Sequence, residues 1–281
     1  MRTVHTAAGL SAAVSSWKSD GATIAFVPTM GALHEGHLSL VAIARRHAPR
    51  VVASIFVNPT QFAPHEDFDS YPRNPERDAA LLARAGCDLL FLPERETIYP
   101  PGFGTWIEPQ GAALGLESDI RPHFFRGVAT VVARLFRLVQ PDIAVFGEKD
   151  AQQLAVVRQL VRDLLLPVEI VGGPIVREPD GLAMSSRNAY LSPDERRRAA
   201  QLSAALLRAK ALFEQGERLT DVLRQAVVAT LAADPGIVVQ YVEVVHPDSF
   251  VPIAEIGHRA LIALAAKVGS TRLIDNLHLA V

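Results

Sequence analysis

The stretch that most constrains the fold reads IAFVPTMGALHEGHLSL and covers residues 24–40. It opens with a continuous apolar run, the pattern of a central strand that is buried on both faces of a parallel sheet. We expect the strand to end at Pro28, because proline donates no hydrogen bond to a ladder, and Gly31 lets the next turn pass close to a ligand. The stretch therefore predicts a central strand followed by a ligand-binding turn.

Two histidines stand at the start of the helix that we expect after this turn. Apolar residues from 38 to 43 recur at helical spacing, which places His34 and His37 on one face of the first helical turn. A helix N-terminus presents unpaired N–H groups and a positive dipole end, so phosphate is the favoured ligand there. The alternatives are a solvated helix face and two ligands of a metal site. The strand and the Pro-Thr-Met-Gly turn before the histidines favour the phosphate site.

The composition argues against several classes of protein. The formal net charge is −2 and 21% of residues are charged, so there is no global attraction to nucleic acid or to an anionic membrane. No apolar stretch approaches the length of a membrane span, and the first residues lack the apolar core of a signal peptide. Cys87 is the only cysteine, which rules out an internal disulfide. We expect a cytoplasmic protein with no nucleic-acid or membrane partner, in which Cys87 is a packed thiol.

Apolar runs typical of buried strands alternate with helical patterns through the first part of the chain. The runs cover residues 24–27, 51–57, 89–92, 143–146 and 168–171, and the clearest helices cover residues 128–139 and 151–165. This alternation predicts an α/β fold with a Rossmann-like parallel sheet, helices on both of its faces, and ligand loops at the carboxyl ends of the strands. We expect residues 93–127, which have no clean period, to form an excursion that covers a site.

The composition changes after Tyr190. The run Ser192-Pro193-Asp194-Glu195 is typical of an N-cap followed by proline at the first helical position, and a long helix follows. A further helix at residues 220–232 and strands at residues 238–245 and 260–266 complete the chain. We therefore expect two domains, with the parallel sheet in residues 1–176 and a smaller C-terminal α+β domain in residues 177–281.

Two further loops carry side chains that suit a nucleotide. Lys149, in Gly147-Glu148-Lys149-Asp150 after an expected strand, supplies a flexible charge for a triphosphate, or else forms a surface ion pair with its neighbours. The run Met184-Ser185-Ser186-Arg187 offers two hydroxyls and a guanidinium for the β- and γ-phosphates, or else is a Ser-rich turn by chance. Sheet topology brings such loops together when they follow neighbouring strands.

Uncharged and acidic residues complete the candidate site. Gln61 and Gln153 are amides that can orient a small hydroxy acid without adding charge, although isolated glutamines are usually surface residues. Glu148 and Asp150 can hold magnesium together with phosphate oxygens, since that ion keeps few protein ligands. The sequence does not distinguish such a magnesium site from structural ion pairs.

Several motifs, in the same order, resemble the pantothenate synthetases, the pantoate:β-alanine ligases of the HxGH nucleotidylyltransferase superfamily. Between residues 24 and 276 they read PTMGALHEGH, SIFVNPTQF, YPRNPERD, RGVATVV, FGEKDAQQL, REPDGLAMSSRN and TRLIDN. The resemblance implies an AMP-forming carbon–nitrogen ligase that condenses (R)-pantoate with β-alanine in coenzyme A precursor biosynthesis. Pantoate attacks the α-phosphate of ATP to give pantoyl adenylate and pyrophosphate, and β-alanine then displaces AMP. The resemblance also implies Mg²⁺ and a homodimer.

The resemblance also implies roles for individual residues. His37, His34, Lys149 and Arg187 would be the catalytic residues, and we expect His37 to stabilise the pentavalent phosphate and the leaving pyrophosphate rather than donate a proton. Gln61 and Gln153 would hold pantoate, with Gln61 also near β-alanine, and the C-terminal domain would close over the site. The ATP-binding residues would be Met30, Gly31, Ala32, Leu33, His34, Glu35, Gly36, His37, Gly147, Glu148, Lys149, Asp150, Val176, Met184, Ser185, Ser186 and Arg187.

One position departs from the family pattern, and two rival functions remain. Where many relatives read Arg-Pro-Gly-His-Phe, residues 121–125 read Arg-Pro-His-Phe-Phe, so Phe124 stands at the histidine position and no role for that histidine carries over. A nucleotidylyltransferase acting on a phosphorylated acceptor is the nearest rival, but it would need more basic residues than two glutamines provide. A noncatalytic nucleotide-binding protein is the other, and it would be expected to have lost at least one of four residues that are all present: His37, Lys149, Ser185 and Arg187.

Overall fold

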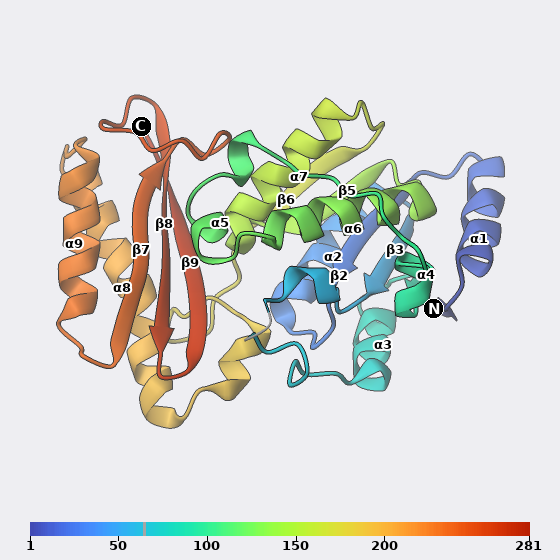
Figure 1. Cartoon of the computed structure of the whole chain (residues 1–281), viewed down its shortest axis with the longest axis horizontal. Coiled ribbons are helices and arrows are strands. Elements are labelled where there is room, and N and C mark those ends of the chain that lie inside the picture. The colour runs from blue at the N-terminus through green and yellow to red at the C-terminus, as the bar shows by residue number, and fades with distance from the viewer. Residues whose placement is uncertain (64–65) are drawn as a thin grey trace.

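The computed structural model describes residues 1–63 and 66–281, and two β-sheets organise it (Figure 1). One sheet has six parallel strands in the order β1-β4-β3-β2-β5-β6, and the other has three antiparallel strands in the order β7-β8-β9. The predicted parallel sheet and the separate smaller α+β domain are therefore confirmed. The strands are β1 (Arg2–Val4), β2 (Ile24–Thr29), β3 (Arg50–Ile55), β4 (Leu89–Phe91), β5 (Ile143–Gly147), β6 (Glu169–Gly173), β7 (Ile237–Val245), β8 (Arg259–Val268) and β9 (Thr271–Ala280).

Helices cover both faces of the parallel sheet. Successive residues of a strand point to opposite faces, so Ile24 and Phe26 pack with α1, α6 and α7, whereas Ala25 and Val27 pack with α2 and α3. This arrangement confirms β2 as a central, doubly buried strand. The helices are α1 (Ala7–Ser19), α2 (Glu35–His47), α3 (Pro75–Arg84), α4 (Arg95–Ile98), α5 (Glu117–Ile120), α6 (Phe124–Val139), α7 (Ala151–Asp163), α8 (Pro193–Glu214) and α9 (Thr220–Ala232).

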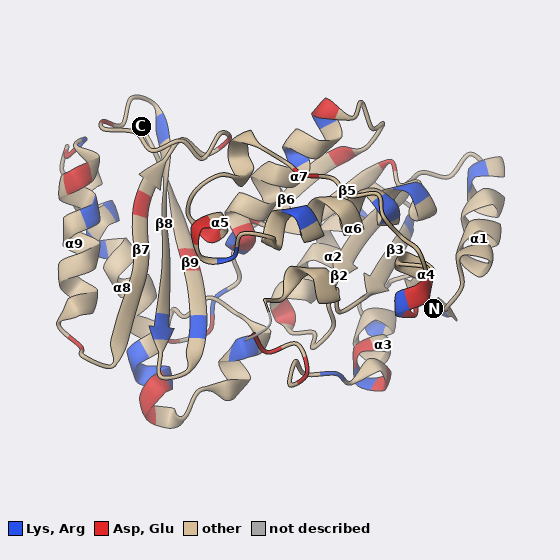
Figure 2. Cartoon of the chain, viewed as in Figure 1, with Lys and Arg blue, Asp and Glu red and all other residues tan. Residues whose placement is uncertain are grey.

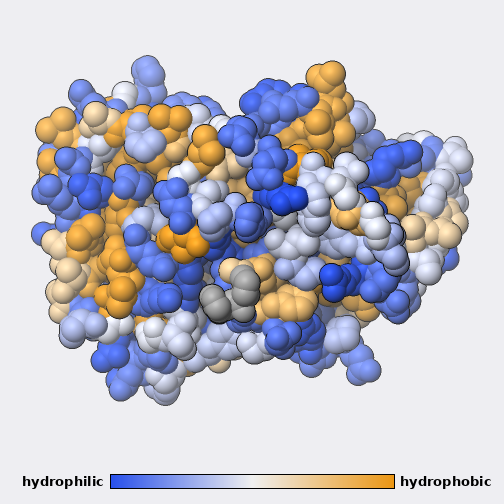
Figure 3. Space-filling model, in the orientation of Figure 1, coloured by the Kyte–Doolittle hydropathy of each residue, from blue (hydrophilic) through white to orange (hydrophobic). Residues whose placement is uncertain are grey.

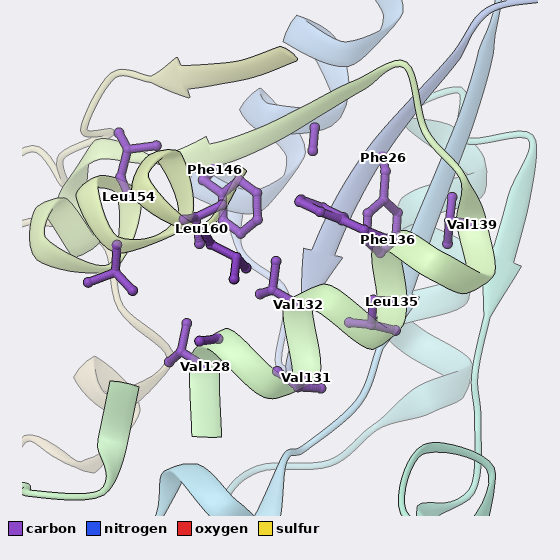
Figure 4. Packing of buried hydrophobic residues seen from close by; sticks show 14 of the residues in the cluster. Phe26, Val128, Val131, Val132, Leu135, Phe136, Val139, Phe146, Leu154 and Leu160 are labelled. Atoms are coloured by element: carbon purple, nitrogen blue, oxygen red, sulfur yellow. The ribbon is translucent and has the colours of Figure 1, made fainter. Parts of the chain in front are cut away.

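The larger core forms between β2 and α6 (Figure 4). The ring of Phe136 lies edge-on to Phe26 and Phe146, with centroids 6.4 Å and 6.3 Å away. Helix α6 begins at Phe124, one turn before the predicted start at residue 128, because the buried Phe125 extends the apolar face of the helix. This packing fixes the first turn of α6 close to the carboxyl ends of the strands.

The prediction that Pro28 ends the first strand was wrong. Pro28 lies within β2 and pairs with Ser54 of β3. The ladder to β5, on the other side, ends at Phe26. Beyond Phe26 the strand is hydrogen-bonded on one side, so the missing N–H of Pro28 is tolerated as it would be in an edge strand.

The smaller domain packs its three-stranded sheet between two layers. Helices α8 and α9 cover one face, while Val245, Leu261 and Ala263 on the other face join the core of the parallel-sheet domain. The predicted cap of α8 is confirmed, because the Ser192 hydroxyl accepts a hydrogen bond from the Glu195 N–H.

The sequence did not predict two of the strands. β1, in the parallel sheet, is very short, and the apolar residues of β9, in the smaller domain, are interrupted by charged ones.

Charged and apolar residues are both distributed over the surface. Lys, Arg, Asp and Glu residues are interspersed in the view of Figure 2, and acidic α5 lies where the two sheets meet. Figure 3 shows apolar residues exposed beside α9 and at the end of α7, where Leu165 is 89% exposed. Within the described part of the chain, no helix is both long and apolar enough to cross a membrane.

Cys87 is packed in the core, as predicted. Its thiol is buried and donates to the carbonyl oxygens of Leu89, at 3.2 Å, and Val51, at 3.4 Å. Burial raises the pKa of the Cys87 thiol to about 11, so little reactive thiolate forms near neutral pH.

Candidate functional site

A cavity of about 970 Å³ lies between the two sheets. Its lining includes residues at or after the carboxyl ends of β2, β3, β5 and β6, together with residues of β7, β8 and β9. Residues 116–125, at the end of the predicted excursion, also line it in part. The cavity therefore lies where ligand loops are expected in an open parallel sheet.

His34 and His37 line the cavity and form a capping box at the start of α2. Nδ1 of His34 accepts a hydrogen bond from the Gly36 N–H at 3.2 Å, and Nδ1 of His37 accepts one from the His34 N–H at 3.3 Å. The ring centroids are 4.1 Å apart. Since each Nδ1 is an acceptor, the proton of each neutral ring resides on Nε2, so each ring has an N–H donor at that atom.

Both imidazoles are held in the neutral form. Burial, followed by the positive charge of Lys149, lowers the pKa of His34 to about 4. Burial, followed by the neighbouring His34, lowers the pKa of His37 to about 3. Near pH 7 the two rings therefore present Nε2–H donors, and they carry no net positive charge before a ligand binds.

The loop before the histidines does not direct all its N–H groups into the cavity. Met30 and Gly36 line the cavity, but the N–H groups of Ala32 and Leu33 donate to the carboxylate of Asp78 at 2.7 and 3.0 Å. Ala32 and Leu33, both predicted to bind ATP, thus direct their N–H groups to Asp78 in this structure. Among the described residues, the cavity lining also omits Gly31, Ala32, Leu33, Glu35, Glu148 and Val176.

Lys149 reaches the cavity from the end of β5. It lines the cavity with Gly147 and Asp150, and its Nζ lies 3.9 Å from Oδ1 of Asp150. The carbonyl oxygens of Glu148 and Lys149 each accept a hydrogen bond from Nδ2 of Asn276 at 2.9 Å. The smaller domain thus holds the loop that carries Lys149, a contact that sequence reasoning missed although Asn276 belongs to the TRLIDN motif.

The Met184–Arg187 segment also lines the cavity, but its arginine is already paired. Nε and Nη2 of Arg187 donate to the two carboxylate oxygens of Asp67 at 2.9 and 2.8 Å. Burial acts to raise the pKa of Asp67, but the bonds from Arg187 outweigh it and hold that pKa below its ordinary value. The Ser186 hydroxyl donates to the Ala32 carbonyl at 3.1 Å, and the Met184 N–H donates to Val176.

The two predicted glutamines lie in the same cavity. Gln61 is 8% exposed, and its Oε1 accepts a hydrogen bond from Nδ2 of Asn58 at 2.8 Å. Gln153 lies in the first turn of α7, while the adjacent Gln152 is buried and bonds to the Ala112 carbonyl and the Glu117 N–H. The structure thus brings Gln61 and Gln153 together with the histidines, Lys149 and the serines.

The family model for pantoate–β-alanine ligase matches residues 2–278. The chain belongs to the pantoate–β-alanine ligase family. A relative from Caulobacter vibrioides, named pantothenate synthetase, is 53% identical over 279 residues, which cover 98% of this chain and 97% of the relative.

Two solved structures agree with this membership. The crystal structure of pantothenate synthetase from Thermus thermophilus matches with a TM-score of 0.93 and 52% identity, covering 99% of each chain. The pantoate–β-alanine ligase from Francisella tularensis, complexed with β-γ ATP and β-alanine, matches with a TM-score of 0.80 and 33% identity. That match covers 99% of this chain and 97% of the other.

Phe124, the departure from the pantoate–β-alanine ligase pattern, lines the cavity and stacks on an arginine. The guanidinium carbon of Arg121 lies 3.9 Å from the centroid of the Phe124 ring. Nη2 of Arg121 also donates to the Gln61 carbonyl and to a carboxylate oxygen of Glu66, each at 2.8 Å. Phe124 therefore packs against the guanidinium that borders the Gln61 end of the cavity.

The acidic residues fit a magnesium ion only in part. Asp150 lines the cavity beside Lys149, whereas the Glu148 carboxylate lies against Gly172, where an added Cβ would be 2.9 Å from Oε1. In residues 1–63 and 66–281, no group of three or more His, Cys, Asp or Glu side chains is placed to hold a metal ion. One carboxylate still suits magnesium, which takes most of its ligands from phosphates and water.

Proposed function

We propose that this chain condenses (R)-pantoate with β-alanine to give pantothenate, with ATP converted to AMP and pyrophosphate. One observation carries the proposal: two Nε2–H donors and Lys149 share a cavity with the uncharged Gln61 and Gln153. The first group suits a polyphosphate and the second suits a small hydroxy acid. Membership of the ligase family supports the same reaction.

We propose that ATP binds with its phosphates toward the histidines and Lys149. Met30, His34, Gly36, His37, Gly147, Lys149, Asp150, Met184, Ser185, Ser186 and Arg187 would contact it, since all of them line the cavity. For Arg187 to bind phosphate, its bond to Asp67 would have to open. The residues Gly31, Ala32, Leu33, Glu35, Glu148 and Val176 would shape the site through the backbone.

Catalysis would depend on orientation and on charge neutralisation. Gln61 and Gln153 would hold pantoate with its carboxylate in line with the α-phosphate, and the attack would form pantoyl adenylate and release pyrophosphate. His37 and His34 would stabilise the developing charge as neutral Nε2–H donors, and Lys149 would add a positive charge. β-Alanine, bound near Gln61, would then attack the acyl carbon and release AMP.

Magnesium would supply further positive charge to the phosphates when bound. Asp150 is the carboxylate that would hold it, since it lines the cavity next to Lys149. The Glu148 carboxylate would take no part, because it lies against Gly172.

The remaining assignments are proposals about organisation. Residues 1–176 would bind nucleotide and pantoate, and residues 177–281 would close over the site, as the β9 residues that line the cavity suggest. The resemblance to the family supports a homodimer, which sedimentation equilibrium would test. A cytoplasmic location agrees with a single, buried cysteine.

Exchange of labelled pyrophosphate into ATP tests the function directly. We expect this exchange to require pantoate. Labelled pyrophosphate enters ATP only when pantoyl adenylate reacts with it in the reverse of the first step. We also expect AMP release only when pantoate and β-alanine are both present. Exchange without pantoate, or with a phosphorylated acceptor in its place, would favour a nucleotidylyltransferase. Nucleotide binding with no AMP release would favour a noncatalytic protein.

A further inference from the structure

Of the YPRNPERD motif, at residues 71–78, only Tyr71 lines the cavity, and none of its residues is among those proposed to contact a substrate. Its last residue, Asp78, lies in the first turn of α3, on the face of the parallel sheet that α2 also covers. The Asp78 side chain is 1% exposed, although aspartate is among the residues least often buried. A carboxylate placed so deeply needs partners that satisfy it.

Its closest partners are backbone groups of the loop before the histidines, and Nη1 of Arg77 also donates to Oδ1 of Asp78 at 3.4 Å. Oδ2 of Asp78 accepts a hydrogen bond from the Ala32 N–H at 2.7 Å, and Oδ1 accepts one from the Leu33 N–H at 3.0 Å. Nη1 of Arg77 donates to the Leu33 carbonyl at 3.2 Å. Asp78 therefore bonds to the N–H groups of this segment and Arg77 bonds to one of its carbonyl oxygens. We call Asp78 and Arg77 the loop clamp.

The segment that the loop clamp holds is conformationally unusual. Gly31 has φ +85° and Ala32 has φ +50°, so two consecutive residues are left-handed and one of them carries a side chain. Such a turn directs successive N–H groups to one point and forms an anion-binding nest. In this protein the nest is filled by Asp78 rather than left for a ligand.

The position of this segment sets the position of both imidazoles. Leu33 directly precedes His34, the N-cap of α2, and the His34 N–H donates to Nδ1 of His37. The hydroxyl of Ser186 donates to the Ala32 carbonyl, so the serine segment rests on the same peptide. A shift of residues 32 and 33 would therefore displace both histidines and Ser186 together.

We propose that Asp78, assisted by Arg77, is a positioning residue that fixes the Nε2–H donors of His34 and His37 for adenylate formation. This inference rests on the proposed ligase function, because it assigns the histidines to that step. The carboxylate satisfies two N–H groups at once, an arrangement that an amide cannot reproduce, since one of its two polar atoms is a donor. Asp78→Asn is therefore the least disruptive change that opens the loop clamp.

The matched control is Asp88→Asn. Asp88 also accepts a backbone N–H, that of Val51 at 2.8 Å, but it precedes β4 at the amino edge of the sheet, away from the cavity. We expect Asp78→Asn to lower the turnover number of pantoate-dependent exchange by about 100-fold, as misplacement of a catalytic group by ~1 Å does. The KM for pantoate should stay unchanged, and Asp88→Asn should keep wild-type exchange. Wild-type exchange per folded molecule in Asp78→Asn would overturn the proposal.

Two further measurements keep the test decisive. If Asp78→Asn does not fold, Arg77→Ala replaces it, because the Arg77 side chain is half-exposed and its removal disturbs the core less. For Arg77→Ala we expect the turnover number to drop by about threefold or more while the melting temperature stays unchanged. Unchanged turnover would then overturn the proposal. Imidazole ¹⁵N spectra need no activity, and we expect the Nε2 resonances of His34 and His37 to shift in Asp78→Asn and to keep their wild-type positions in Asp88→Asn. Unshifted Nε2 resonances in Asp78→Asn would overturn the positioning role, whereas absent exchange in the wild type would refute only the ligase function.

Discussion

At the scale of single residues, the two histidines combine a structural and a chemical role. Nδ1 of each ring accepts a backbone N–H, which caps α2, and this same bond commits the proton to Nε2. Burial keeps both rings neutral by lowering the pKa of His34 to about 4 and that of His37 to about 3. The donors that the two rings present to the cavity are therefore set by helix capping rather than by an imidazolium charge.

Substitution of His37 separates hydrogen bonding from proton donation. Glutamine can replace both functions of the neutral ring, since it is a favoured third residue of a capping box and its amide can donate. We expect His37→Gln to keep pantoate-dependent exchange within about tenfold of wild type, and His37→Ala to lose about 100-fold or more. His47→Gln, at the exposed end of α2, is the control and should leave exchange unchanged. Equal losses in the Gln and Ala variants would instead indicate that proton donation is required.

The lowered pKa values also predict how stability depends on pH. Between pH 6.5 and about 4 the unfolded chain protonates His34 and His37 while the folded protein does not, so the free energy of unfolding falls as the pH is lowered. Each histidine contributes up to about 1.4 kcal/mol per pH unit within that window and nothing above it. Urea unfolding at pH 7 and pH 5 should show a smaller loss in the His34→Gln, His37→Gln double variant. An equal loss in wild type and variant would contradict this account.

The sequence predicts where the candidate site residues that follow a strand lie, but it does not predict the hydrogen-bond partners of such residues. Lys149 and Gln153 follow the run that forms β5, so strand order alone places them at the carboxyl edge of the sheet. Arg187 was expected to face phosphate, yet its guanidinium is held by Asp67, 120 residues away in sequence. Asp78 belongs to a recognisable motif, but nothing local indicates that its carboxylate fills a backbone nest.

At the scale of secondary-structure elements, the contact between α6 and the loop after β3 is unusually close. A Cβ added at Gly127 of α6 would lie 2.5 Å from the Thr60 carbonyl oxygen, which belongs to backbone and cannot rotate away. Nδ2 of Asn58 donates to the Gly127 carbonyl at 3.2 Å and to Gln61. The position of Gln61 in the cavity therefore depends on the absence of a side chain at residue 127.

Gly127→Ala should therefore weaken the binding of pantoate. We expect the added methyl group to displace the Asn58–Gln61 turn and raise the KM for pantoate by about tenfold or more, because a 1 Å misplacement of positioning residues has effects of this size or larger. The KM for ATP should change less, since the histidines lie on another helix. Steady-state kinetics with each substrate varied in turn measures both constants.

The matched control is Gly257→Ala, which adds the same methyl group where no atom lies within 4 Å. That variant should keep both KM values of the wild type. An unchanged KM for pantoate in Gly127→Ala would show that the turn accommodates the methyl group or that Gln61 does not bind pantoate.

Elements whose apolar residues follow one clear pattern were predictable from the sequence, and elements that mix apolar and charged residues were not. The continuous apolar run of β2 and the apolar face of α6 are recognisable in the sequence, because burial of apolar side chains decides nearly every position of each element. β9 carries Arg272, Asp275 and Asn276 among apolar residues, and all three line the cavity. Its polar positions serve the junction between the sheets, a role that no local pattern reveals.

At the scale of the whole molecule, one ion-pair network joins the two sheets. Glu117 of α5 accepts hydrogen bonds from Nη2 and Nη1 of Arg272 in β9, at 2.6 and 2.9 Å, and from the Tyr241 hydroxyl in β7 at 2.8 Å. Burial acts to raise the pKa of Glu117, but the bonds from Arg272 outweigh it, and that pKa lies below its ordinary value. All three side chains line the cavity, so the network joins α5 to the three-stranded sheet at the wall of the cavity.

Removal of Arg272 should uncouple the domains. Arg272→Met leaves the buried carboxylate of Glu117 without its main partner, so we expect the free energy of unfolding to fall by about 3 kcal/mol. Both tryptophans, Trp17 and Trp106, lie in the parallel-sheet domain, so fluorescence follows that domain while circular dichroism follows both. In urea, the two signals should change together in the wild type and at separate midpoints in the variant. Arg224→Met, which removes an exposed ion pair on α9, should leave them together. Coincident, unshifted transitions in Arg272→Met would mean that apolar contacts alone hold the domains together.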